Sequence, residues 1–125
     1  MTPEWFESRA WIWLHYAVVK LGRGELFEAM GMLAFFREQI LGPMLYRRAN
    51  LPQRGVRRIE FHGIDPDGLL TSTLATHDRD SVSLAIKMAA DAYINLRADA
   101  VPDNIADDAA RWAVLTMLNE YSDRG

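Results

Sequence analysis

Four side chains near the start of the chain could together bind an anionic ligand that contains a ring. They recur at intervals of three or four residues and are Arg9, Trp13, Tyr16 and Lys20. This spacing puts them on one stripe of a helix, where two cations would lie beside two aromatic planes. An ammonium group offers phosphate a point charge, and aromatic rings can stack on a nucleotide base or a drug ring. The alternative is that Trp13 belongs to the core and that Lys20 only complements the helix dipole.

Two charged residues that follow Lys20 belong to the same candidate site. Arg23 stands between Gly22 and Gly24, which read as a helix stop and a tight turn, and it could contact the same anion. Glu25 could orient Lys20 or Arg23. Each residue also has a simpler explanation. An arginine in a turn is usually solvated, and a glutamate at the start of a helix is stabilised by the helix dipole.

These residues must be positioned by a helix that begins near the N-terminus. Pro3 suits a first helical turn with Thr2 as its cap, so we expect a helix from Pro3 to Leu21. From Ala10 to Val19 only His15 is neither apolar nor aromatic. The helix should therefore be buried on nearly every side, with His15 as a core histidine that is hydrogen-bonded through one ring nitrogen.

A second helix should begin near Glu25 and break or kink at Gly42-Pro43, because proline cannot continue the helical hydrogen bonds. The periodicity predicts that one stripe of this helix is buried. The stripe comprises Leu26, Met30, Leu33 and Ile40, widened by Phe27, Ala34 and Phe35.

The segment from Asn50 to Gly68 contains several prolines and glycines, which indicates a connection with one short ordered piece near residues 56–61. A short helix is expected over residues 66–75. Asp78 or Asp80 should then cap a long helix that ends near Leu96.

A last helix should begin at Asp103 or Asn104 and bury an apolar stripe that starts at Ile105. Four long helices and a short one predict an all-α fold. We expect a four- to five-helix up-and-down bundle that forms a single domain over residues 1–125.

The composition narrows the classes of function. Half of the residues are hydrophobic, the net charge is −3 and there is no cysteine. An acidic chain is a poor general binder of nucleic acid, and the lack of thiols excludes disulfides and thiolate metal sites. Neither a secretory leader nor a stretch of the roughly 20 apolar residues needed to span a bilayer is visible, so we expect a cytoplasmic protein without a membrane partner. The three histidines are far apart, and no metal site is expected.

The first 35 residues resemble the start of the helical C-terminal domain of the antibiotic-type nucleotidyltransferases, the aminoglycoside and lincosamide enzymes and their relatives. The resemblance lies in an aromatic pair, a Tyr-x-x-x-Lys spacing and an Arg-Gly-Glu-Leu turn. In this sequence these are Trp5-Phe6, Tyr16 to Lys20 and Arg23 to Leu26. The resemblance implies a helical domain that packs on a catalytic domain, with Lys20 in contact with a nucleoside triphosphate.

The sequence also departs from that family. The catalytic half carries a Gly-Ser turn followed by an Asp-x-Asp pair that holds magnesium, and this chain has no Gly-Ser dipeptide. The Asp-x-Asp pairs at residues 65–67 and 78–80 are better explained as turn and cap residues. The carboxylate base that some members place before the lysine is Tyr16 here. No catalytic or metal-binding residue can therefore be assigned, and use of ATP or another nucleoside triphosphate with magnesium would require a catalytic partner.

A second resemblance involves Arg57 and His62. Their Arg-x4-His spacing is that of helical ribonucleases that are paired with small nucleotidyltransferases in toxin–antitoxin systems. In such enzymes the arginine stabilises phosphate charge and the histidine transfers protons. Arg54 and Arg58 make this stretch locally basic, although a solvated loop would look the same.

Three hypotheses follow. The first is a non-catalytic nucleotide- or substrate-binding domain that acts with a separate or missing nucleotidyltransferase catalytic domain. The second is a ribonuclease toxin, and the third is a dimeric interaction module without a small-molecule site. Because a domain interface without its partner would expose apolar surface, we expect a homodimer.

Overall fold

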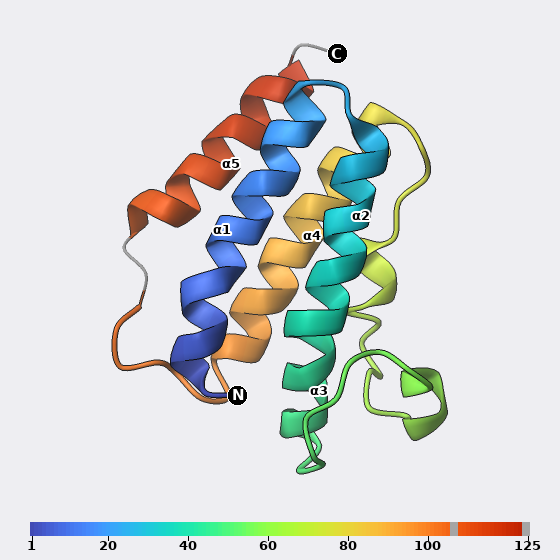
Figure 1. Cartoon of the computed structure of the whole chain (residues 1–125), viewed down its shortest axis with the longest axis vertical. Helices are drawn as coiled ribbons and strands as arrows, with labels where there is room; N and C mark the ends of the chain where they lie inside the picture. Colours follow the sequence, from blue (N-terminus) through green and yellow to red (C-terminus); the bar gives the residue numbers. More distant parts are fainter. Residues whose placement is uncertain (106–107, 124–125) are drawn as a thin grey trace.

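A computed structural model describes the backbone of residues 1–105 and 108–123, and the side chains of residues 1–105 and 113–120. The described part is all-α, with helices packed together and no strand, which confirms the predicted fold class (Figure 1). The helices are α1 (Pro3–Gly22), α2 (Leu26–Phe36), α3 (Gly42–Arg48), α4 (Arg79–Arg97) and α5 (Asp108–Asp123). Among the described residues, no helix combines the length and apolar character needed to span a membrane.

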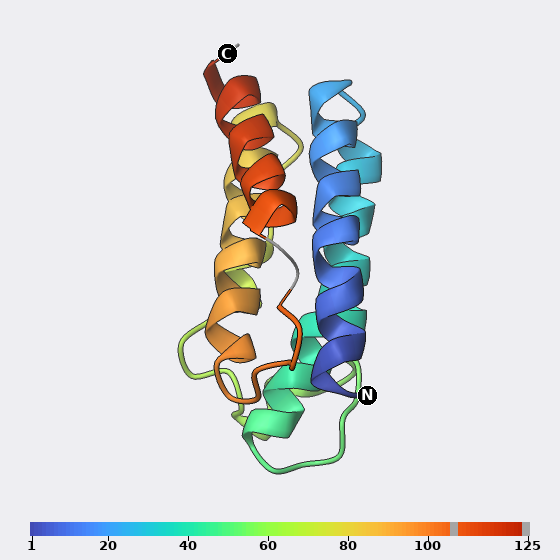
Figure 2. The same cartoon turned by 90° about the vertical axis from the view of Figure 1, so that its left-hand side faces the viewer.

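The helices do not strictly alternate in direction along the chain, as the expected up-and-down order would have it. α1 runs up the molecule, α2 and α3 run down, α4 also runs down, and α5 runs up (Figures 1 and 2). α4 is parallel to α2 because the connection over residues 49–78 returns along the molecule before α4 begins. α1 contacts α2, α4 and α5 and is the central element of the bundle.

α1 begins and ends close to the predicted positions. The Thr2 side chain accepts a hydrogen bond from the Trp5 backbone N–H (3.2 Å), with Pro3 in the first turn. Its inward stripe is fully buried and comprises Phe6, Ala10, Leu14, Ala17, Val18 and Leu21. The prediction that His15 is a core histidine was wrong, because His15 is exposed. It lies on the outward stripe that also contains Ser8 and Ile12, and the apolar Ile12 is exposed there as well.

A buried carboxylate joins α1 to α4. Glu7 is only 3% exposed and accepts hydrogen bonds from Trp11 Nε1 (3.0 Å), the Tyr93 hydroxyl (2.5 Å) and Arg97 Nη1 (3.1 Å). Burial and the hydrogen bond to Glu7 raise the pKa of the Tyr93 hydroxyl, so the phenol stays protonated and keeps donating. Three donors thus compensate for removing one carboxylate from water.

A break or kink was expected at Gly42-Pro43, and the structure shows no break there: the helix widens and continues. A π-helical turn over Arg37–Leu41 joins α2 to α3, and the Gly42 N–H donates to the Arg37 carbonyl five residues earlier. Pro43 has no N–H to donate, and its ring would clash with the carbonyl four residues before it in an α-helix. The wider turn removes this conflict and lets the chain remain helical to Arg48.

Three predictions for α2 need correction. Leu33 and Ile40 are buried as expected, but Phe27 and Phe35 are 80% and 42% exposed, and Ala34 is exposed as well. They do not widen the core stripe, because α1 and α4 cover only one side of α2 and the other side faces solvent.

The predicted helix over residues 66–75 is absent, and only a 3-10 turn at Thr71–Thr73 is present there. The Asp65 carboxylate accepts hydrogen bonds from the backbone N–H groups of Leu69 (2.8 Å) and Leu70 (3.0 Å). Gly68 adopts a left-handed conformation with φ of +69°. These two features close a local turn that competes with a helix.

The boundaries of the last two helices were predicted unequally well. Asp78 caps α4 by accepting a hydrogen bond from the Ser81 N–H (2.8 Å), and hydrogen bonds from Thr76 and Ser81 lower the pKa of its carboxyl. α5 begins at Asp108 rather than at Asp103 or Asn104. The Asp103 N–H instead donates to the Glu4 side chain (3.1 Å), which holds this segment beside the start of α1.

Ile105, which precedes α5, is 50% exposed, so its predicted burial was wrong. The expected burial of Trp112 lies outside the described side chains.

Replacing Glu7 with glutamine should lower the free energy of unfolding by about 3 kcal/mol. The neutral amide leaves the partly buried Arg97 without its counter-charge. Urea denaturation followed by circular dichroism measures the loss, and Glu120→Gln on the exposed side of α5 is the matched control. A loss of less than about 1 kcal/mol, the value typical of a surface ion pair, would contradict the proposed role of the network.

Candidate functional site

The four side chains predicted on one stripe of α1 do share the outward side of that helix. Arg9 stacks over the Trp5 ring with its guanidinium carbon 4.3 Å from the ring centroid. Lys20 Nζ lies 5.3 Å from the centroid of the Tyr16 ring. Trp13 lies between these two pairs and contacts Trp5 edge-to-face, with 6.1 Å between ring centroids. The structure therefore places each of the two predicted cations beside an aromatic ring.

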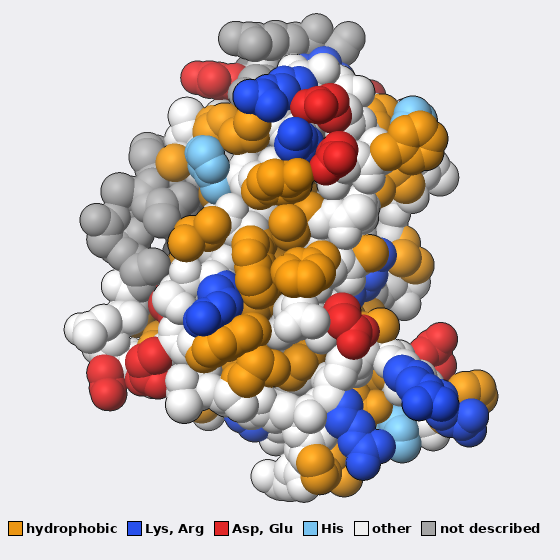
Figure 3. Space-filling view, viewed as in Figure 1, with side chains coloured by type: hydrophobic (Ala, Val, Ile, Leu, Met, Phe, Trp, Pro, Cys, Tyr) orange, Lys and Arg blue, Asp and Glu red, His pale blue; other side chains and the backbone are white. Residues whose placement is uncertain are grey.

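α2 extends this surface with three more apolar side chains. We call the combined set the aromatic face, which comprises Trp5, Trp13, Tyr16, Phe27, Met32 and Phe35. Trp13 and Phe35 join the two helices through an edge-to-face contact of 4.8 Å between centroids. Figure 3 shows hydrophobic side chains running along the molecule over α1 and α2. Such a continuous exposed apolar surface is typical of a binding or interaction site.

An open groove of about 410 Å³ lies on the α2 side of the aromatic face. Tyr16 and Phe35 form walls of the groove, and Gly31 leaves space at its floor because nothing lies within 4 Å of the position of a Cβ there. The Tyr16 hydroxyl donates to Glu28 (2.9 Å), and this hydrogen bond raises the pKa of Tyr16. Tyr16 therefore offers a neutral ring to a ligand in the groove.

Lys20 is held in place by its neighbours. Its side chain is only 18% exposed, and Nζ lies 3.6 Å from the Glu25 carboxylate. Glu25 also lies 3.9 Å from Arg23, so the three charged residues predicted as one site meet at the same end of α1. Arg23 is 65% exposed, which fits a solvated turn residue. A phosphate that binds Lys20 would have to replace Glu25 as its partner.

The alternative residues Arg57 and His62 line one hollow of about 500 Å³ together with Arg54 and Arg58. None of the three arginines forms an ion pair with a described residue. The His62 ring packs edge-to-face on Tyr46, with 5.7 Å between centroids. Figure 3 shows the resulting cluster of basic side chains around a histidine. The hollow is a local cationic site on a chain of net charge −3.

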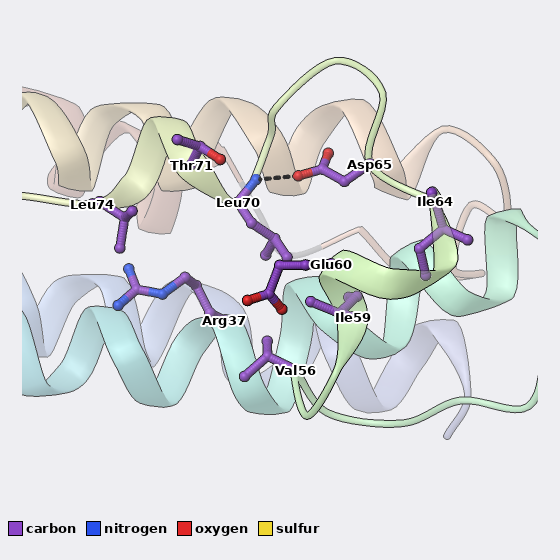
Figure 4. A pocket seen from close by; sticks show the side chains of 10 residues that line it. Arg37, Val56, Ile59, Glu60, Ile64, Asp65, Leu70, Thr71 and Leu74 are labelled. Carbon is purple, nitrogen blue, oxygen red and sulfur yellow. Dashed lines mark hydrogen bonds between the residues drawn. The ribbon is translucent and has the colours of Figure 1, made fainter.

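A third hollow, of about 370 Å³, was not predicted from the sequence. It lies between the π-helical turn and the connection over residues 56–74 (Figure 4). Its apolar walls are Val56, Ile59, Ile64, Leu70 and Leu74. We call it the Arg37 pocket, because that arginine supplies its cation.

Arg37 is partly buried, and burial lowers the pKa of its guanidinium. Nη1 donates to the carbonyl (3.0 Å) and the hydroxyl (3.1 Å) of buried Thr73. Its Nε and Nη2 make no hydrogen bond to a described residue, and no described carboxylate pairs with it. The sequence offered one indirect sign of this site, because Pro43 predicts an irregular turn just after Arg37.

Close packing of two glycines fixes the wall of the Arg37 pocket. A Cβ on Gly42 would lie 3.0 Å from the carbonyl carbon of Gly55, and a Cβ on Gly55 would lie 1.9 Å from the Glu38 carboxylate. Glu38 in turn accepts a hydrogen bond from the Val56 N–H (2.9 Å). The connection therefore lies directly against the π-helical turn.

Comparison with protein-family models, curated proteins and solved structures finds no match to this chain. The resemblance of the first 35 residues to nucleotidyltransferase helical domains remains a hypothesis from the sequence. Among the described residues, no three histidine or acidic side chains are grouped so that they could hold a metal ion.

Replacing Gly42 with alanine should destabilise the protein by about 1–3 kcal/mol, because the new methyl group meets backbone that must shift. Gly31→Ala is the matched control on the same continuous helix. It should stabilise by about 0.5–1 kcal/mol, since Gly31 has open space around it and alanine favours the helix. Thermal unfolding compares the two variants, and equal shifts would contradict the close contact with Gly55.

Proposed function

We propose that this chain is a non-catalytic helical domain that binds a nucleotide or another ring-containing anionic substrate and acts with a separate nucleotidyltransferase-type catalytic domain or chain. The observation that supports this most directly is the juxtaposition on α1 of two cations with aromatic rings, of which Tyr16 is exposed and Trp5 and Trp13 are partly buried. Lys20 lies over Tyr16, Arg9 lies over Trp5, and Trp13 fills the space between the pairs. Trp5, Tyr16 and Lys20 also belong to the motifs on which the family resemblance rests.

In this proposal Lys20 binds phosphate and the aromatic face receives the ring of the ligand. The Lys20 side chain is only 18% exposed and is already confined beside the Tyr16 ring. It therefore loses little side-chain entropy when it binds an anion. Glu25 is its resting partner and is exchanged for phosphate on binding. Tyr16, Trp13 and Arg9 orient the rest of the ligand.

The chemistry would come from the partner. Phosphoryl and nucleotidyl transfer need carboxylates that hold magnesium against the triphosphate, and among the described residues no three acidic or histidine side chains are grouped to hold a metal ion. ATP or another nucleoside triphosphate with magnesium would therefore be held jointly with the catalytic domain. The exposed apolar residues of the aromatic face would pack on that domain, and in its absence we propose that they pair two copies of the chain as a homodimer.

Titration with ATP while tryptophan fluorescence is recorded tests this proposal, because Trp13 lies on the same side of α1 as Lys20. Lys20→Ala should weaken binding about tenfold, the effect of losing one charge-assisted hydrogen bond. Glu25→Gln should strengthen binding, since it removes the competing carboxylate. Lys87→Ala is the matched control, because Lys87 is the other lysine of the chain and is exposed on α4.

Equal affinities for Lys20→Ala and Lys87→Ala would refute the role of Lys20. Appearance of an adenylylated product when the purified chain is mixed with ATP, magnesium and aminoglycosides would refute the non-catalytic proposal.

A second function, that of a ribonuclease, is favoured by one observation. Arg57 and His62 line the same cationic hollow, and none of its arginines is neutralised by a described carboxylate. In this proposal Arg57, with Arg54 and Arg58, would stabilise the phosphate, and His62 would transfer the proton.

Incubation with total RNA separates the two functions. Cleavage that is lost in His62→Ala and retained in His15→Ala, a control at an exposed histidine of α1, would support the ribonuclease. Intact RNA after incubation with the wild-type chain would eliminate it and leave the binding domain.

A further inference from the structure

The Arg37 pocket combines two opposite charges that do not pair with each other. Arg37 reaches it from the π-helical turn, and Glu60 reaches it from the 3-10 turn Ile59–His62 (Figure 4). Figure 4 shows the Glu60 carboxylate directed across the pocket, between Val56 and Leu70. Glu60 makes no hydrogen bond or ion pair with a described residue. The pocket thus offers one unpaired group of each sign.

The second carboxylate of the pocket, that of Asp65, is already satisfied. Both oxygens of the Asp65 carboxylate accept backbone N–H groups, from Leu69 and Leu70. Asp65 therefore shapes the wall and does not compete for a ligand. The rest of the lining is largely aliphatic, and the volume of about 370 Å³ falls within the range of small-ligand pockets, about 300–1,000 Å³.

The walls are held in place before any ligand arrives. Thr73 fixes one edge of the Arg37 guanidinium through Nη1, and Nε and Nη2 have no hydrogen-bond partner among the described residues. The Glu38 hydrogen bond to Val56 fixes the opposite wall. A guanidinium held in this way loses little freedom when it binds a carboxylate.

We propose that the Arg37 pocket binds a small zwitterion with an aliphatic body, such as a branched-chain amino acid. The carboxylate of the ligand would contact the free nitrogens of Arg37, its ammonium group would contact Glu60, and its side chain would lie against Ile59, Ile64 and Leu70. A purely anionic ligand would be repelled by Glu60, and a purely cationic one would be repelled by Arg37. The site is separate from the aromatic face and does not depend on nucleotide binding.

NMR titration with three probes of the same shape tests this site. The probes are L-leucine, 4-methylpentanoate, which lacks the ammonium group, and leucinamide, which lacks the carboxylate. The wild-type chain should bind leucine about tenfold more tightly than either analogue, because each analogue loses one of the two charge pairs, either with the partly buried Arg37 or with the exposed Glu60.

Glu60→Gln is the decisive variant, since Glu60 is exposed and makes no hydrogen bond or ion pair with a described residue. It should abolish the preference for leucine over 4-methylpentanoate while the melting temperature stays unchanged. Asp91→Asn is the matched control, because it removes one exposed carboxylate from α4 outside the pocket, and it should preserve the preference. Arg37→Gln should in turn abolish the preference for leucine over leucinamide.

Three outcomes would overturn the proposal. These are no shift at residues 56–74 with any probe, equal binding of all three probes, and an unchanged preference for leucine in Glu60→Gln. A marked fall in the melting temperature of Glu60→Gln would instead show that Glu60 and Arg37 pair with each other in solution, which also excludes the site. Lys20→Ala should leave leucine binding unchanged, so failure here and failure of the nucleotide proposal can be distinguished.

Discussion

The orientation of α1 depends on the burial of one carboxylate. Glu7 must face inward to meet Tyr93 and Arg97 of α4, and its own helix supplies the third donor, Trp11. Once Glu7 points into the bundle, the helical repeat fixes every other side chain of α1. Arg9, Trp13, Tyr16 and Lys20 then lie outside, although the chain around them is as apolar as a core. The aromatic face is therefore a consequence of where the buried acid is placed.

This dependence explains what could be predicted for α1 and what could not. Pro3, Thr2 and the turn at Gly22 defined the limits of the helix, and the spacing from Arg9 to Lys20 defined a common stripe. Nothing in a run that is apolar on all sides says which side faces water. His15 was therefore placed in the core, whereas Glu7, which fixes the orientation, looks like an ordinary surface acid in the sequence. Glu7 is buried because its partner Tyr93, which lies 86 residues further along the chain, donates a hydrogen bond to it.

The two other hollows differ in how far local sequence determines them. Arg57 and His62 were paired by their spacing alone, and they do meet, because the 3-10 turn Ile59–His62 keeps neighbouring residues close. The Arg37 pocket draws its walls from three segments that show no common period. Its formation needs the Gly42–Gly55 contact and the turn closed by Asp65, which are interactions between distant parts of the chain or between side chain and backbone. Periodicity cannot reveal such a site, and only the disruptive effect of Pro43 hints at it.

The widened turn before Pro43 also has a consequence for how this region tolerates insertions and deletions. A π-helical turn amounts to one residue more than the α-helix would use, and each residue of an α-helix rotates the chain by about 100°. Loss of a single residue between 37 and 41 would restore regular α-helical spacing and leave α3 with about the same rotation, but it would bring the ring of Pro43 against the carbonyl four residues before it. The extra residue of the wide turn and the proline that follows it therefore depend on each other, and a change in chain length here would have to be matched by a change at Pro43.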